Sequence, residues 1–155
     1  MLRIIVAVIL LLFLLTAVFG ANIPQPQGLV NDYVSKLTPS EKRTLENKIA
    51  TFQKDAQLII TIVPDMQGEE IAPFANQMFN TWGIGSKGIN RGVLLLVAMK
   101  EHKIRIEVGY GFEGAFPDLK TKEVINKITP LLGQNKWFEA FDKAIDDIAL
   151  ISKKE

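Results

Sequence analysis

Hydrophobic residues along this chain follow two kinds of spacing, and their order predicts the elements of the fold. Two continuous apolar runs, Gln57–Val63 and Gly92–Met99, predict strands that are buried on both faces. Lys103–Val108 alternates charged and apolar residues, as a half-buried strand does. Because only a short turn at Glu101-His102 precedes it, this third strand is expected to pair antiparallel with the second.

Four other segments carry the three-to-four-residue spacing of amphipathic helices. The first opens with the capping box Thr38-Pro39-Ser40-Glu41, and the second follows Gly68. Two more are expected over roughly 119–132, with a kink at Pro130, and 136–152. The residues expected on buried faces are Leu45, Ile49 and Phe52, then Ile71, Phe74, Ala75, Met78, Phe79 and Trp82, and finally Trp137, Phe141, Ala144, Ile145, Ile148 and Ile151.

The order of elements is helix, strand, helix, strand, strand, helix, helix. Two strands joined through a helix are most often parallel, with a right-handed crossover, and the hairpin adds an antiparallel strand. The chain is therefore expected to be an α/β protein, a three-layer α/β/α sandwich with a small mixed sheet flanked by helices on both faces.

The first 21 residues are predicted to be a signal peptide or an N-terminal membrane anchor. Arg3 precedes an apolar run over residues 4–19 that only Thr16 interrupts, and the small residues Gly20-Ala21 follow. Sixteen residues is long for a signal core and short for a membrane span, so both alternatives stay open. In either case Arg3 stays in the cytoplasm, and the rest of the chain is expected to be exported to the periplasm or the extracellular space.

The remainder is expected to be one monomeric domain. Residues 22–28 form a polar, proline-containing linker, and residues 29–155 are long enough to bury a core. Of the 18 basic residues only Arg3 lies in the leader, so the rest of the chain has 17 charges of each sign and no basic stripe for nucleic acid. The chain has no cysteine, which excludes disulfides and a thiol nucleophile.

The most distinctive segment is the glycine-rich loop Gly109-Tyr110-Gly111-Phe112-Glu113-Gly114, which comes directly after the alternating strand and precedes Pro117-Asp118. Glycines at this spacing let the backbone turn tightly or approach a ligand closely. A dinucleotide is not expected there, because Glu113 would face its pyrophosphate. The similar glycine pattern over residues 83–88 follows a helix rather than a strand, so no nucleotide cofactor is predicted.

Four carboxylates, three of them in or near this loop, are the candidate chemistry. Asp32, Glu107, Glu113 and Asp118 offer the oxygen ligands that Ca²⁺ prefers. The alternative is structural: Asp118 caps the next helix and Glu107 is solvated. His102, the only histidine, is predicted to be a solvated turn residue, which argues against a Ser-His-Asp triad and a zinc site.

Four groups of segments together form a specific pattern. They are Val30-Asn31-Asp32-Tyr33 with Leu37-Thr38 and Glu41, Phe74-Ala75 with Met78-Phe79 and Trp82-Gly83-Ile84-Gly85, Gly92-Val93-Leu94-Leu95-Leu96-Val97-Ala98, and Arg105-Ile106-Glu107-Val108-Gly109-Tyr110-Gly111-Phe112-Glu113-Gly114 with Pro117-Asp118. Through these segments the sequence resembles the TPM domain family over about residues 29–152. The resemblance implies an α/β/α sandwich, export and often a membrane tether; some members bind Ca²⁺ and some show weak acid phosphatase activity.

The family's acidic cluster would fall on Asp32, Glu113 and Asp118. Where the family often has Asp-Asn-Gly before the long strand, this chain has Asn90-Arg91-Gly92. One carboxylate is therefore missing, and Arg91 could instead pair with the acidic residues or bind a phosphate oxygen.

A cleft is expected in which Asp32, Asn90, Glu113 and Asp118 converge as metal ligands, for Ca²⁺ rather than Mg²⁺. Arg91, Gly109 and Gly111 are expected to complete it. The function expected from this cleft is an exported module that binds a divalent cation, a membrane-protein partner, or both, in assembly or maintenance. The alternative is a weak metal-dependent acid phosphatase.

Overall fold

The computed structural model describes residues 20–52, 56–85 and 90–153. Most of the expected signal peptide or anchor therefore lies outside the described residues. Within these ranges no helix is both long and apolar enough to cross a membrane.

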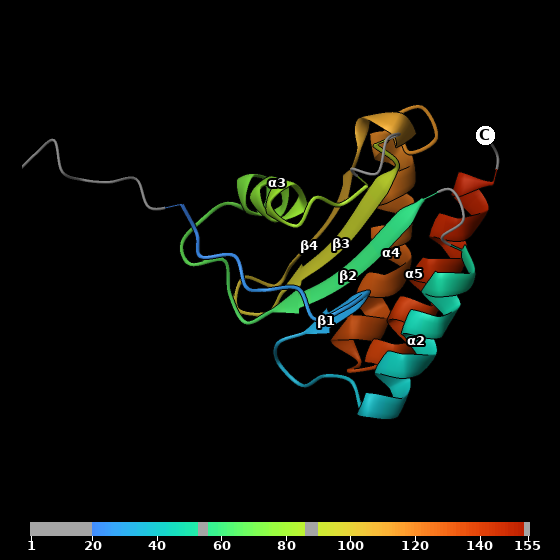
Figure 1. Ribbon diagram of the computed structural model, residues 1–155. Helices are drawn as coiled ribbons and strands as arrows, with labels where there is room; N and C mark the ends of the chain where they lie inside the picture. The colour runs from blue at the N-terminus through green and yellow to red at the C-terminus, as the bar shows by residue number, and fades with distance from the viewer. Residues whose placement is uncertain (1–19, 53–55, 86–89, 154–155) are drawn as a thin grey trace, which may run out of the picture.

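A four-stranded mixed sheet forms the middle layer of the molecule (Figure 1). Its order is β1 (Val30–Asp32), β2 (Gln57–Val63), β3 (Gly92–Ala98) and β4 (Lys103–Val108). The first three strands are parallel and β4 is antiparallel to β3, which confirms the predicted arrangement of β2, β3 and β4. β1 was not predicted, because three residues are too few to show an alternation of apolar and polar positions.

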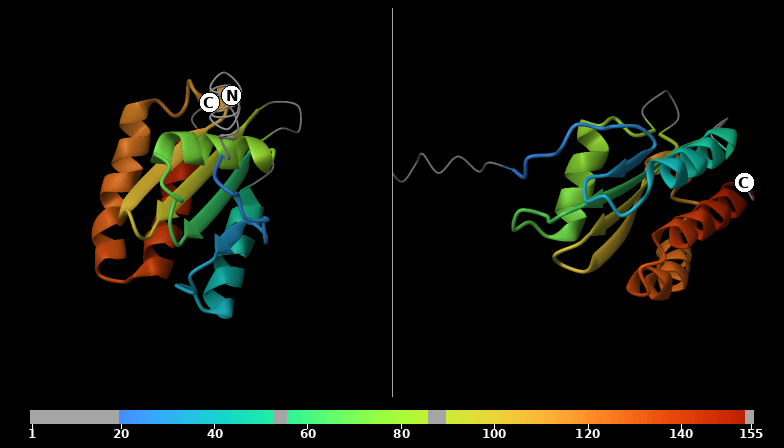
Figure 2. Two further views of the ribbon diagram at one scale, coloured as in Figure 1. Left: turned by 90° about the vertical axis from the view of Figure 1, so that its left-hand side faces the viewer. Right: turned by 90° about the horizontal axis from the view of Figure 1, so that it is seen from below.

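Helices cover both faces of the sheet (Figures 1 and 2). One face carries α3 (Ile71–Thr81), and the other carries α2 (Pro39–Phe52), α4 (Asp118–Gly133) and α5 (Trp137–Ser152). The predicted three-layer sandwich is confirmed. The capping box at the start of α2 also forms, since the Glu41 carboxylate accepts the Thr38 N–H at 2.7 Å and the Thr38 hydroxyl accepts the Glu41 N–H at 3.2 Å.

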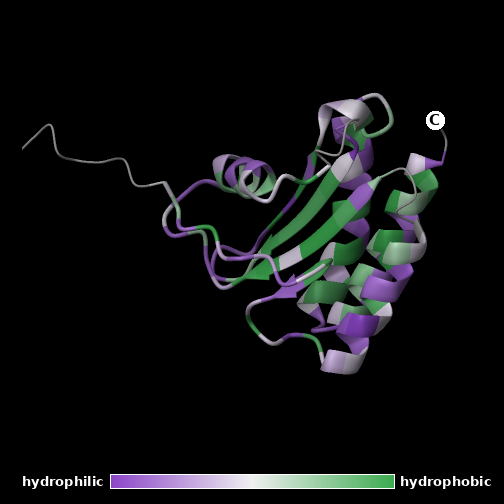
Figure 3. Cartoon of the chain, viewed as in Figure 1, coloured by the Kyte–Doolittle hydropathy of each residue, from purple (hydrophilic) through white to green (hydrophobic). Residues whose placement is uncertain are grey.

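β2 and β3 are hydrophobic over nearly their whole length, because both of their faces are covered (Figure 3). Successive side chains alternate between two cores, one under α3 and a larger one under the other three helices. On α2, Leu45 and Ile49 are fully buried as expected, while the side chain of Phe52 lies outside the described residues. The strand residues facing the larger core are Leu58, Ile60, Ile62, Val93, Leu95 and Val97, and those facing α3 are Ile59, Val63, Leu94, Leu96 and Ala98.

The segment 20–28, most of it predicted as a linker, lies along α3 and is held there by hydrogen bonds. The Gln77 side chain donates to the carbonyl of Ala21 at 2.8 Å, and the Trp82 indole donates to the carbonyl of Pro24 at 2.9 Å. Ala21 is buried in the core under α3. This segment therefore packs on α3. Trp82 is half-buried beneath it.

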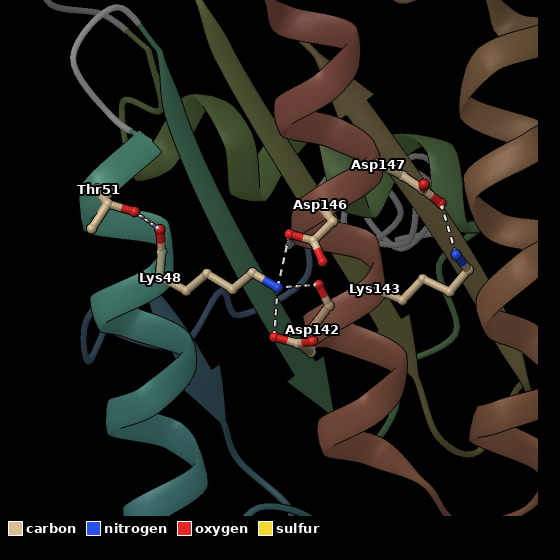
Figure 4. A network of polar contacts seen from close by, with 6 residues as sticks. All are labelled: Lys48, Thr51, Asp142, Lys143, Asp146 and Asp147. Atoms are coloured by element: carbon tan, nitrogen blue, oxygen red, sulfur yellow. Dashed lines mark hydrogen bonds and ion pairs between the residues drawn. The ribbon is translucent and has the colours of Figure 1, made fainter.

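α2 and α5 are joined by an ion-pair network centred on Lys48 (Figure 4). The Lys48 ammonium lies 2.6 Å from Asp142 Oδ1 and 2.9 Å from Asp146 Oδ1. Burial lowers the pKa of Lys48, but the hydrogen bonds and charges of the two aspartates outweigh it and raise the pKa above its ordinary value. The stabilisation is therefore present below the ordinary lysine pKa and is lost only as pH rises through the raised pKa.

The burial of α3 predicts unequal costs for its two phenylalanines. Phe74 is 1% exposed, whereas Phe79 is half-buried. Phe74→Ala is expected to lower the free energy of unfolding by roughly 3–5 kcal/mol. Phe79→Ala should cost less than about 2 kcal/mol, because less apolar area is removed from water in the parent. Urea denaturation of both variants measures this, and equal costs would contradict the packing of α3.

Candidate functional site

The glycine-rich loop and the segment before β3 meet at the amino ends of β2 and β3. β4 runs antiparallel to β3, so its last residue lies beside the start of β3. The Gly109 N–H donates to the carbonyl of Gly92 at 2.9 Å, and the Gly111 N–H donates to the carbonyl of Asn90 at 3.1 Å. Four of the predicted residues are thus brought together, namely Asn90, Arg91, Gly109 and Gly111.

Glycines are required here because backbone segments pack against each other. A Cβ on Gly109 would lie 2.2 Å from the Asn90 carbonyl oxygen, and one on Gly85, whose φ is +73°, would lie 2.4 Å from the Gly92 nitrogen. The start of β2 is joined to these segments as well, since the Gln57 side chain accepts the Gly85 N–H at 2.7 Å. These glycines therefore serve chain packing, and the close approach is to backbone rather than to a ligand.

Aromatic residues anchor the loop to the core. Phe112 and Phe116 are buried and pack edge to face, with ring centroids 5.4 Å apart. The Arg91 guanidinium lies 4.4 Å from the centre of the Phe112 ring. The positive charge of Arg91 is therefore placed next to the loop that carries Glu113.

A groove of about 380 Å³ runs along the free edge of β4 and brings the acidic residues together. Glu113 and Asp118 both line it and are exposed, and within the described part of the chain neither carboxylate has a hydrogen-bond or ion-pair partner. Glu107 lies 2.7 Å from Arg105, and its side chain is only 15% exposed. The groove thus has two unpaired carboxylates and one that is already neutralised.

Neither structural alternative for these residues holds. Pro117, not Asp118, is the N-cap residue of α4, and no side-chain cap hydrogen bond forms there. Asp118 is instead the first helical residue, where a negative charge is favourable. Glu107 is paired and largely buried rather than solvated.

Asp32 does not share this cleft, so the expected convergence of four residues is wrong. In the sheet register Asp32 lies opposite Ile62, whereas Gly92 lies opposite Gln57, which separates the two sites by about 16 Å along the strands. The Asp32 carboxylate accepts the N–H groups of Val34 and Leu37 at 3.1 and 2.8 Å. It fixes the turn between β1 and α2 at the opposite end of the sheet.

The sheet register therefore separates Asp32 from the other three predicted cation ligands. Across residues 20–52, 56–85 and 90–153, no three His, Asp or Glu side chains are grouped as ligands for one ion. Ca²⁺ usually takes six to eight oxygen ligands. Glu113 and Asp118 would supply only part of such a set, and Ca²⁺ binding here stays a prediction.

A second pocket, of about 360 Å³, lies at the carboxyl end of β3. His102 lines it and is an exposed turn residue, as predicted. Lys36 and Trp137 line it too, and neither was singled out as a site residue. One general rule could have drawn attention to them: α/β folds bind ligands at the carboxyl ends of parallel strands. The glycine loop, which the sequence pattern singled out, lies at the amino ends.

Comparisons with known proteins agree with this fold. The family model of the TPM domain matches residues 30–151. Among curated proteins none matches significantly.

Solved structures share the fold, and three of them illustrate the similarity to this chain. The N-terminal domain of a protein from P. gingivalis has a TM-score of 0.71 and 20% sequence identity, and the match covers 79% of this chain and 80% of that chain. The N-terminal domain of the cg2496 protein from Corynebacterium glutamicum has a TM-score of 0.62 and 14% identity, with 83% of this chain and 84% of that chain covered. The BA42 protein from Bizionia argentinensis has a TM-score of 0.66 and 18% identity, with 76% of this chain and 82% of that chain covered.

The backbone contact at Gly109 predicts a specific intolerance. Gly109→Ala is expected to lower the free energy of unfolding by about 1–3 kcal/mol, because the added methyl group overlaps the Asn90 carbonyl. Gly133→Ala is the matched control, since no atom beyond its chain neighbours and its own helix backbone lies within 4 Å of its Cβ position, and it should be neutral or stabilising by about 0.4–1 kcal/mol. Urea denaturation compares them. Equal stabilities would show that the loop does not pack on Asn90.

Proposed function

Because the chain belongs to the TPM domain family, we propose that it is an exported binding module whose glycine-loop end binds a membrane-protein partner in assembly or maintenance. The observation that carries the proposal is the gathering of exposed apolar side chains and unpaired carboxylates at this one end of the molecule.

The large hydrophobic side chains exposed in the described part of the chain are Tyr110, Leu119 and Leu150, with exposed fractions of 82%, 66% and 57%. Tyr110 lies in the loop, and Leu119 directly follows Asp118. Leu150 lines a hollow of about 650 Å³ together with Gly114 of the loop. Exposed apolar residues grouped in this way are typical of protein interaction surfaces.

The negative charge at this end indicates which residues a partner would present. Glu113 and Asp118 lie beside the exposed apolar residues and have no cationic partner in the described chain. A partner segment with apolar residues flanked by Lys or Arg would complement both features. A partner in the membrane fits the expected leader, which would hold the domain at the membrane or release it just outside.

An acid phosphatase has less support from this geometry. A general acid or base has to lie within hydrogen-bond reach of the reacting group. His102 is in the turn between β3 and β4, at the other end of the strands from Glu113 and Asp118. Hydrolysis of a phosphomonoester that Asp118→Asn abolishes would favour the phosphatase over the binding module.

Site-directed crosslinking tests the proposal. A photo-crosslinking phenylalanine analogue in place of Tyr110, in the full chain expressed in its own cells, is expected to capture one membrane protein. The same analogue in place of Lys100, an exposed residue at the opposite end, is the matched control and should not capture it. The double variant Glu113→Gln/Asp118→Asn should reduce the yield at position 110 at least about tenfold, the factor for 1.4 kcal/mol. Equal capture at both positions would contradict the proposal.

Ca²⁺ binding at this end, which the family resemblance implies, should be weak. With only Glu113 and Asp118 as carboxylate ligands, we propose a dissociation constant no tighter than about 1 mM. About 1 mM Ca²⁺ should therefore raise the free energy of unfolding by less than about 0.5 kcal/mol. A Ca²⁺-titrated thermal melt measures this. A gain near 2.7 kcal/mol that Asp118→Asn removes would indicate a complete cation site instead.

A further inference from the structure

The pocket at the carboxyl end of β3 is distinct from the glycine-loop end. We infer that it binds a small carboxylic acid with an apolar tail or ring. Three connections build it: the turn after β1 supplies Lys36, the β3–β4 turn supplies His102, and the α4–α5 turn supplies Asn135. Its volume of about 360 Å³ is within the usual range for small-molecule sites.

The walls of the pocket are apolar and fixed in place. The Trp137 indole is 8% exposed, and its N–H donates to Asn135 Oδ1 at 2.6 Å, which holds the ring at the pocket wall. An alkyl chain or ring bound there would be removed from water, which favours binding. The other apolar residues lining the pocket are Val97, Ala98, Met99, Ile104 and Leu132.

The charge of the pocket selects an anion. The Lys36 ammonium lies 5.5 Å from the centre of the Trp137 ring, and in the described chain it has no carboxylate partner. Lys48 and Lys127, in contrast, each lie close to an aspartate. Among the described residues no Asp or Glu lines the pocket, and His102 lines it as a second nitrogen-bearing side chain. A carboxylate would therefore meet a lysine without having to displace another acid.

The position of the pocket is the position that α/β folds use for ligands. It lies outside the carboxyl end of a central parallel strand, where the loops that follow neighbouring strands converge. The glycine loop lies at the amino ends of the same strands, so a ligand in this pocket would not overlap a partner bound at the loop.

Three eight-carbon probes that differ only in their head group test the inference: octanoate, octanol and octylammonium. Binding is read from Trp137 fluorescence in a Trp82→Phe background, or from the Trp137 indole N–H resonance in the unaltered protein. Octanoate is expected to bind saturably and at least about tenfold more tightly than octylammonium, a difference of 1.4 kcal/mol. Octanol should fall between them.

Substitution of Lys36 provides the decisive comparison. Lys36→Met keeps the length and apolar stem of the side chain but removes its charge, so it should weaken octanoate binding about tenfold and leave octanol binding unchanged. Lys100→Met is the matched control, because Lys100 is exposed in the adjoining turn and does not line the pocket. Octanoate that binds no tighter than octylammonium, equal effects of the two substitutions, or no change at Trp137 with any probe would each overturn the inference.

Discussion

The parallel pairing of β2 with β3 is the interaction on which the rest of the structure depends. Seven consecutive residue pairs join the strands from Gln57–Gly92 to Val63–Ala98, and every β3 side chain in this run is buried. A strand apolar on both faces is stable only between two layers of helices. This pairing therefore requires the three-layer arrangement, and it also fixes which loops lie at the amino end and which at the carboxyl end of the sheet.

The two ends have opposite chemistry. At the amino end, glycines let the chain cross itself closely, and Phe112 anchors a loop that presents Tyr110 and Glu113 to solvent. At the carboxyl end, Lys36 faces the indole of Trp137 over an apolar pocket without carboxylates. The proposed binding of a partner at one end and the inferred binding of a small acid at the other are compatible in one domain, because a whole strand length separates the two ends.

Much of the fold could be predicted from the sequence because local patterns were long enough. The helices show a clear period, β4 alternates, and β2 and β3 are continuous apolar runs, each over six or more residues. β1 has three residues and gains its stability from pairing with β2, so no local pattern indicates it. Because β1 was not predicted, the convergence of Asp32 with Glu113 looked feasible, although the register of Asp32 in the sheet places it at the far end.

The candidate site was predictable only in part, for a related reason. The glycine loop and its contact with Asn90 follow from the β3–β4 hairpin, which is local in sequence. The second pocket joins Lys36, His102 and Asn135, which lie in three separate turns. Their proximity depends on tertiary packing. A lysine, a histidine or an asparagine alone in a turn does not indicate a binding site.

One distance tests the separation of the two ends most directly. The chain has no cysteine, so Ser35→Cys and Glu113→Cys place two spin labels without background. Both positions are exposed, and Ser35 adjoins the turn that Asp32 fixes. The sheet register predicts a mean label distance by electron paramagnetic resonance above about 20 Å, from the strand rise and the spacing between strands. A mean distance below about 15 Å would place Asp32 with the glycine loop and contradict the account.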